Sequence, residues 1–178
     1  VIYPHRDVDA LGTALAQHAS EPGHKVVVTE SLFSMDGDIA PLREMLLLAR
    51  HYGGELVVDE AHATGVCGPE GRGLVAHFGL QREVFAIVHT AGKALASMGA
   101  FVCGSEALKE FLINRARPFI FSTAAPPYLA HQLRAALRLA RQAEPEPVRC
   151  CRQIPRNASA AIRFRSPASS GTWLPEEA

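Results

Sequence analysis

Residues 55–65 read E-L-V-V-D-E-A-H-A-T-G, a short apolar run that ends in charged and polar side chains. A continuous apolar run of this kind is typical of a strand buried on both faces of a parallel sheet. Similar runs lie at 25–29 and 84–88, and a shorter one at 100–103 stands between two glycines. In chain order, these runs predict four strands of one sheet, over 25–29, 55–59, 84–88 and 100–103.

Helical patterns separate the predicted strands. Residues 41–52 combine Pro41, which suits a first helical turn, with an apolar stripe, and Gly53 follows as a stop signal. Strand, helix and strand in this order form a βαβ unit, so we expect an α/β domain with a mostly parallel sheet. Further helices are predicted over 8–18, 105–117 and 127–142.

The composition narrows the class of function. The chain has 178 residues, 48% of them hydrophobic, and 18 basic side chains balance 18 acidic ones. A formal net charge of zero makes nucleic acid an unexpected partner, and no apolar run approaches the ~20 residues of a membrane span. The four cysteines form no disulfide framework, which is typical of reduced thiols in the cytoplasm. No set of residues has metal-ligand spacing, so no metal is expected.

The chain divides near residue 142. Residues 143–178 contain five prolines and no lysine, and they show no sustained helical or strand period. We therefore expect 1–142 to form a domain and 143–178 to be a low-order tail, of the kind that out-of-frame translation produces. Because the chain begins at Val1 in mid-pattern, we also expect it to be a piece of a longer protein.

Polar residues follow each of the first three predicted strands. Ser34 comes after the first strand in E-S-L-F-S-M-D-G-D, Asp59 and His62 come after the second, and Thr90 and Lys93 come after the third in H-T-A-G-K-A-L. Ligands of doubly wound sheets bind at the carboxyl ends of the strands. Three strands thus deliver serine, carboxylate, imidazole, hydroxyl and amine groups to one edge, which predicts an active site there.

The letters D-E-A-H at 59–62 also suggest a helicase-type nucleoside triphosphatase. A phosphate loop of the form G-x-x-x-x-G-K-[ST] is absent, because Ile87 stands at the first glycine position and Ala94 follows the lysine. The lysine also comes after the acidic strand, whereas a phosphate loop would precede it. The order of the motifs therefore disfavours this class.

The same residues suit pyridoxal 5′-phosphate (PLP). PLP needs a lysine for a Schiff base and an acid that keeps its pyridine nitrogen protonated. Lys93, between small neighbours, and Asp59, at a strand end, fit these two roles. Further contacts are expected from His62 to the 3′-oxygen, and from Thr90, Ser122 and Thr123 to the phosphate.

Several ordered motifs over residues 1–142 resemble those of the α-oxoamine synthases, a family of fold-type-I PLP-dependent enzymes. They are E-S-L-F-S-M-D-G-D-I-A-P-L, V-V-D-E-A-H-A-T-G, H-T-A-G-K-A-L and F-S-T-A-A-P-P. The resemblance implies part of a three-layer large domain with a mostly parallel sheet, ending in the helix that leads to a small domain. It also implies an acyltransferase and a homodimer with shared sites.

The resemblance also implies a role for each site residue. Lys93 would hold PLP and act as the catalytic base, with His62 as the second catalytic residue, and Asp59 would pair with the pyridine nitrogen. His62 and Ser34 would lie near the 3′-oxygen. The phosphate would be bound by Thr90 and, from the neighbouring subunit, by Ser122 and Thr123.

The implied reaction is a decarboxylative condensation of an amino acid with an acyl thioester. The motifs favour L-alanine and a pimeloyl thioester, carried by coenzyme A or by a carrier protein. Glycine C-acetyltransferase and 5-aminolevulinate synthase are alternatives within the family, and a non-catalytic remnant of a disrupted gene is an alternative of another class. In the lysine motif, Ala91 and Ala96 stand where the family commonly has an aromatic residue and a glycine. The family's glycine-rich phosphate turn and small domain are not found, so we expect the fragment to be inactive alone.

Two features are open to more than one interpretation. The glycines of G-P-E-G-R-G at 68–73 favour a surface turn over an anion-binding cradle. His89 either forms a wall of the site or packs in the interior.

Overall fold

The computed structural model describes residues 1–143, so the predicted tail beyond 143 lies outside the described residues. The elements are α1 (Val8–Gln17), β1 (Val26–Glu30), α2 (Leu42–His51), β2 (Glu55–Asp59), the 3₁₀ turn η1 (Pro69–Gly71), α3 (Leu74–His77), β3 (Ala86–Thr90), β4 (Ala100–Gly104), α4 (Glu106–Arg115), α5 (Arg117–Ile120) and α6 (Pro127–Gln142). Within residues 1–143, no helix is both long and apolar enough to cross a bilayer.

The predicted helix over 105–117 is two helices. Ser105 caps α4 by accepting a hydrogen bond from the backbone N–H of Leu108. The chain then becomes extended at Ala116, and α5 begins at the next residue. Pro118 explains the break, because a proline inside a continuous helix removes one backbone donor and clashes with the preceding turn, whereas the first turn of a new helix tolerates it.

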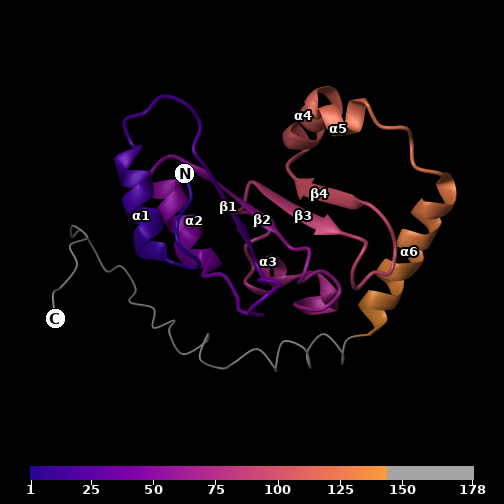
Figure 1. Cartoon of the computed structure of the whole chain (residues 1–178). Coiled ribbons are helices and arrows are strands. Elements are labelled where there is room, and N and C mark those ends of the chain that lie inside the picture. The colour runs from indigo at the N-terminus through magenta and orange to yellow at the C-terminus, as the bar shows by residue number, and fades with distance from the viewer. Residues whose placement is uncertain (144–178) are drawn as a thin grey trace.

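The sheet has four strands in the order β1-β2-β3-β4. The pairs β1–β2 and β2–β3 are parallel, and β3–β4 is antiparallel because a short hairpin joins these two strands. The expected α/β domain with a mostly parallel sheet is therefore confirmed. Figure 1 shows α1, α2 and α3 gathered beside β1 to β3, with α6 at the far end of the hairpin.

The hydrophobic core lies between one face of the sheet and the helices α1 to α3. Leu11 and Leu46 from the helices pack with Val27 and Val58 from the strands in this core. The opposite face of β1 is open, since the side chain of Val28 remains 60% exposed. The prediction that the strands are buried on both faces is thus wrong for β1, because helices cover only one of its faces among the described residues.

The G-P-E-G-R-G segment is a turn with exposed and buried positions. Pro69 and Arg72 are exposed, as the favoured surface turn predicts, whereas Gly71 and Gly73 are buried. Gly73 has a φ of +95°, and a Cβ atom at this position would overlap the carboxylate of Glu60. Only glycine has both this φ and no Cβ atom, so Gly73 can pack directly against Glu60.

Candidate active site

Lys93 and His62 meet at the edge of the sheet. Lys93 lies in the β3–β4 hairpin, and its Nζ atom is 3.0 Å from Nε2 of His62, in the turn that follows β2. The side chain of Lys93 is exposed, and His62 is half-buried. Residues 31 positions apart in the chain are therefore brought into hydrogen-bond contact at the edge where the sequence places both.

Asp59 is the last residue of β2, three residues before His62, and it is half-buried. Its Oδ1 atom accepts a hydrogen bond of 2.8 Å from the backbone N–H of Ala61. Its backbone carbonyl accepts another, of 2.9 Å, from the N–H of Ser31 at the end of β1. The carboxylate is thus held at the strand end, where it also caps the turn that carries His62.

Thr90 lies on the same face of the sheet as Asp59. Asp59 is in register with Val88 on β3, and Thr90 follows Val88 by two residues, which places it on the same side of the pleat. The hydroxyl of Thr90 is buried and finds no hydrogen-bond partner within residues 1–143. The Ser97 hydroxyl, in the same hairpin as Lys93, is equally unpartnered. Two unused donors therefore accompany the lysine.

Ser97 is a residue that the sequence interpretation missed. A serine in a loop carries no motif of its own, and only the folding of the hairpin encloses its hydroxyl. Its position four residues after Lys93 is the one signal that the sequence offered.

The other predicted site residues are not joined to this group. Ser34 is exposed in the turn after β1. Ser122 and Thr123 are exposed between α5 and α6, and the Ser122 hydroxyl donates to the carbonyl of Pro118. Among the described residues, no hydrogen bond links these three to Asp59, His62, Thr90 or Lys93.

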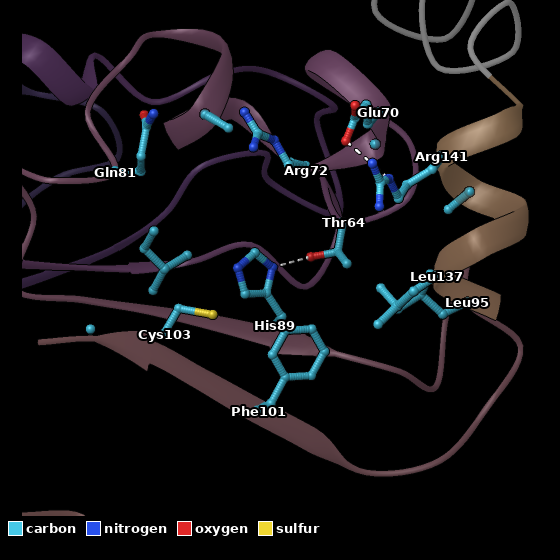
Figure 2. A pocket seen from close by; sticks show the side chains of 15 residues that line it. Thr64, Glu70, Arg72, Gln81, His89, Leu95, Phe101, Cys103, Leu137 and Arg141 are labelled. Carbon is cyan, nitrogen blue, oxygen red and sulfur yellow. Dashed lines mark hydrogen bonds and ion pairs between the residues drawn. The ribbon is translucent and has the colours of Figure 1, made fainter. Parts of the chain in front are cut away.

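His89 is an interior residue on the other side of β3. Figure 2 shows its ring between Thr64 and Phe101. Its Nδ1 atom is 2.8 Å from the Thr64 hydroxyl, and its ring stacks on Phe101 with centroids 4.9 Å apart. Burial lowers the pKa of His89, and the nearby charge of Asp59 raises it in part. His89 therefore packs behind the site and does not form its wall.

A cavity of about 670 Å³ lies on this rear side, between the hairpin, η1 and α6. His89, Leu95 and Leu137 are among its lining residues. An ion pair of 3.2 Å between Glu70 and Arg141 connects η1 to α6 across its rim (Figure 2). Thr90 and Asp59 are not in this lining, so the cavity is separate from the face that carries the site.

The residues present fit PLP. An exposed amine, a carboxylate with one oxygen committed to the backbone, and two buried unpartnered hydroxyls match its aldehyde, ring nitrogen and phosphate. The backbone at Gly92 is also open, because a Cβ atom there would meet nothing closer than the Ser97 carbonyl oxygen at 3.9 Å. A flat group can therefore approach the chain beside Lys93.

Comparisons with known proteins agree with this geometry. The family model for class I and II aminotransferases matches residues 1–148. A curated 8-amino-7-oxononanoate synthase of Paraburkholderia phymatum is 51% identical over 138 residues, which cover 78% of this chain and 34% of that protein. The chain thus spans about a third of the length of the curated relatives that it matches.

Solved structures show the same fold. Serine palmitoyltransferase from S. paucimobilis, in a structure with bound PLP–myriocin aldimine, superposes with a TM-score of 0.76 at 34% identity, covering 83% of this chain and 38% of that one. The 8-amino-7-oxononanoate synthase of Francisella tularensis gives a TM-score of 0.69 at 31% identity, over 83% of this chain and 42% of its own. These likenesses confirm the fold-type-I large domain and the resemblance to α-oxoamine synthases.

Proposed function

Because the chain belongs to the class I and II aminotransferase family, we propose that residues 1–142 form the part of a PLP site that contains the lysine and aspartate. The observation that carries the proposal is the contact between Lys93 and His62, in the turn that begins at Asp59. Amine, imidazole and carboxylate converge there at the carboxyl ends of parallel strands, where sheets of this kind bind ligands.

The reaction proposed for the whole enzyme is that of 8-amino-7-oxononanoate synthase in biotin synthesis. L-Alanine condenses with a pimeloyl thioester, and CO₂ and the free thiol of the carrier are released. The support is the 51% identity to a relative of that name. Glycine C-acetyltransferase and 5-aminolevulinate synthase would use the same residues with other substrates, and no contact in the structure favours them.

Each side chain has a distinct part in the proposed site. PLP, when bound, supplies an electron sink for negative charge at the α-carbon of an amino acid. Lys93 would bind its aldehyde and, when free, would take a proton from the α-carbon on Nζ. Asp59 would accept a hydrogen bond from the protonated ring nitrogen on the oxygen that Ala61 leaves free. His62 would orient Nζ of Lys93, and the Thr90 hydroxyl, which has no partner among residues 1–143, would donate to the phosphate.

The remaining predicted contact residues lie outside the group formed by Asp59, His62, Thr90 and Lys93. We propose that Ser34 approaches the 3′-oxygen, and that Ser122 and Thr123 serve the phosphate of a second subunit in a homodimer. Their exposure in the single chain is consistent with a role toward a partner. The domain boundary near residue 142 and the inactivity of the fragment alone belong to the same proposal.

Titration of the 178-residue chain with PLP tests the proposed site. We expect a visible absorption band for the wild type, loss of the band in Lys93→Ala, and its retention in Lys109→Ala, which removes an exposed lysine of α4. Asp59→Asn should weaken PLP binding by roughly tenfold, because a charge-assisted hydrogen bond contributes about 1.5 kcal/mol or more.

Two results would contradict the proposal. A band of wild-type strength in Lys93→Ala would remove the lysine from its role. A wild-type chain that folds but gives no band at any PLP concentration would favour the non-catalytic remnant instead.

A further inference from the structure

Glu60 is a buried carboxylate between two residues of the proposed site. It follows Asp59 directly, precedes His62 by two positions, and is 0% exposed. Its oxygens accept backbone hydrogen bonds from Leu74 at 3.0 Å and from Val75 at 2.6 Å. Burial raises the pKa of Glu60, and these two N–H groups lower it in part. The side chain thus ties the His62 turn to the first residues of α3.

The backbone of Glu60 fixes the same turn. Its N–H donates to the carbonyl of Val88 on β3 at 2.8 Å. Its carbonyl accepts from the N–H groups of Ala63 and Thr64, at 3.0 and 2.8 Å, and from the Thr64 hydroxyl at 2.7 Å. The backbone N–H and the carbonyl of Glu60 therefore both hold the turn around His62, the first to β3 and the second to the end of the turn.

A second hydrogen bond joins the end of the His62 turn to β3. The Thr64 hydroxyl lies 2.8 Å from Nδ1 of His89 (Figure 2). His89 is next to Thr90 and four residues before Lys93. The turn with His62 and the strand that leads to Lys93 are thus linked through buried hydrogen bonds.

Gly73 leaves room for the carboxylate of Glu60. A Cβ atom on Gly73 would overlap Oε2 of Glu60 and lie 2.6 Å from its Cδ, which is too close for either atom. The carboxylate therefore fills the space that any other residue at 73 would need. A buried carboxyl group needs hydrogen-bond partners, and here two backbone N–H groups donate to it.

We propose that Glu60 is a positioning residue that holds His62 against Lys93 through its bonds to Leu74 and Val75. The proposal deepens the proposed function, because it concerns the same site and rests on it for its biological meaning. Its first test needs no PLP, so the two can fail separately.

The test is an NMR measurement on the 178-residue chain without ligand. The nuclear Overhauser effect between the His62 ring and the Lys93 side chain reports their contact. We expect Glu60→Gln to lower this signal at least about fivefold, since an amide replaces one acceptor oxygen with a donor that faces a backbone N–H. Glu70→Gln is the matched control, because it removes a charge from the neighbouring η1 that pairs with Arg141, and it should leave the signal unchanged.

Leu15→Ala is the control for a general loss of stability, because it weakens the packing of α1 in the core, away from the His62 turn. If Glu60→Gln fails to fold, Glu60→Asp takes its place, because a shorter side chain cannot reach both donors and should lower the signal as well. A folded Glu60 variant with the wild-type signal overturns the proposal. So does a Leu15→Ala variant that loses the signal to the same extent.

PLP affinity gives a second readout through a double-mutant cycle. Glu60→Gln alone should raise the dissociation constant by about tenfold, and it should have no further effect in a His62→Phe background, because coupled residues are not additive. Equal effects of Glu60→Gln in both backgrounds would show that Glu60 does not act through His62.

Discussion

His89 shows how a single hydroxyl can fix the state of an imidazole. The Thr64 hydroxyl is 2.7 Å from the Glu60 carbonyl oxygen and 2.8 Å from Nδ1 of His89. A carbonyl oxygen only accepts hydrogen bonds, so the hydroxyl proton goes to Glu60 and Nδ1 donates to Thr64. The ring therefore carries a proton on Nδ1, and it lies buried behind the site.

This arrangement predicts a loss of stability in acid. Burial lowers the pKa of His89 below its ordinary value of 6.5, so the unfolded chain binds the proton more readily than the folded one. The free energy of unfolding should fall as the pH drops from about 6.5 toward the lower folded pKa, and His89 should add no pH dependence above that range. Urea unfolding of His89→Gln should show a smaller acid-induced loss than the wild type.

The control for this prediction is His131→Gln, which replaces an exposed histidine of α6 and should keep the wild-type dependence. Identical acid-induced losses in His89→Gln and in the wild type would show that another group is responsible.

At the scale of the element, α2 illustrates how one face of a helix anchors the sheet. Leu42, Met45, Leu46 and Ala49 are buried at the spacing of one helical face, whereas Leu47 is 62% exposed. Leu46→Ala should lower the free energy of unfolding by about 2–5 kcal/mol, because it leaves a cavity in the core. Leu47→Ala, on the next residue, should change it by about 0.5 kcal/mol or less.

Chemical denaturation of the two leucine variants side by side measures this difference. Similar losses in both would mean that α2 does not pack as described, since only burial distinguishes the two positions.

Local patterns account for the elements that were predicted correctly. The apolar runs at β2 and β3 and the stripe of α2 are periodic within one segment, so the sequence shows them directly. The order of polar residues after the strands predicted a shared edge, and the contact between Lys93 and His62 itself is visible only in the structure. The role of Glu60 was not visible, because it depends on a contact with residues 74 and 75 that no local pattern encodes.

The burial of Gly71 and Gly73 within G-P-E-G-R-G was not visible for a similar reason. Glycines and a proline in a short segment predict a turn, but they do not show which glycines the rest of the chain covers. At Gly73 the covering group is the Glu60 carboxylate, which occupies the space beside it. The open face of β1 could not be foreseen either. An apolar run shows that both faces of a strand can be buried, but it does not show whether other elements pack on both.

At the scale of the whole molecule, the site is an edge that several strands share. β1, β2 and β3 end together, and the hairpin to β4 brings Lys93 back to the turn after β2. The chain achieves this within about a third of the length of its curated relatives. We propose that this edge binds PLP through Lys93.

The most direct test of that claim uses the fact that the chain contains only three lysines, Lys25, Lys93 and Lys109. The folded chain is mixed with PLP and reduced with borohydride, and the peptides are then mapped by mass spectrometry. We expect the added mass of the reduced cofactor on the peptide that contains Lys93. Equal modification of all three lysines, or modification of Lys25 or Lys109 without Lys93, would contradict it.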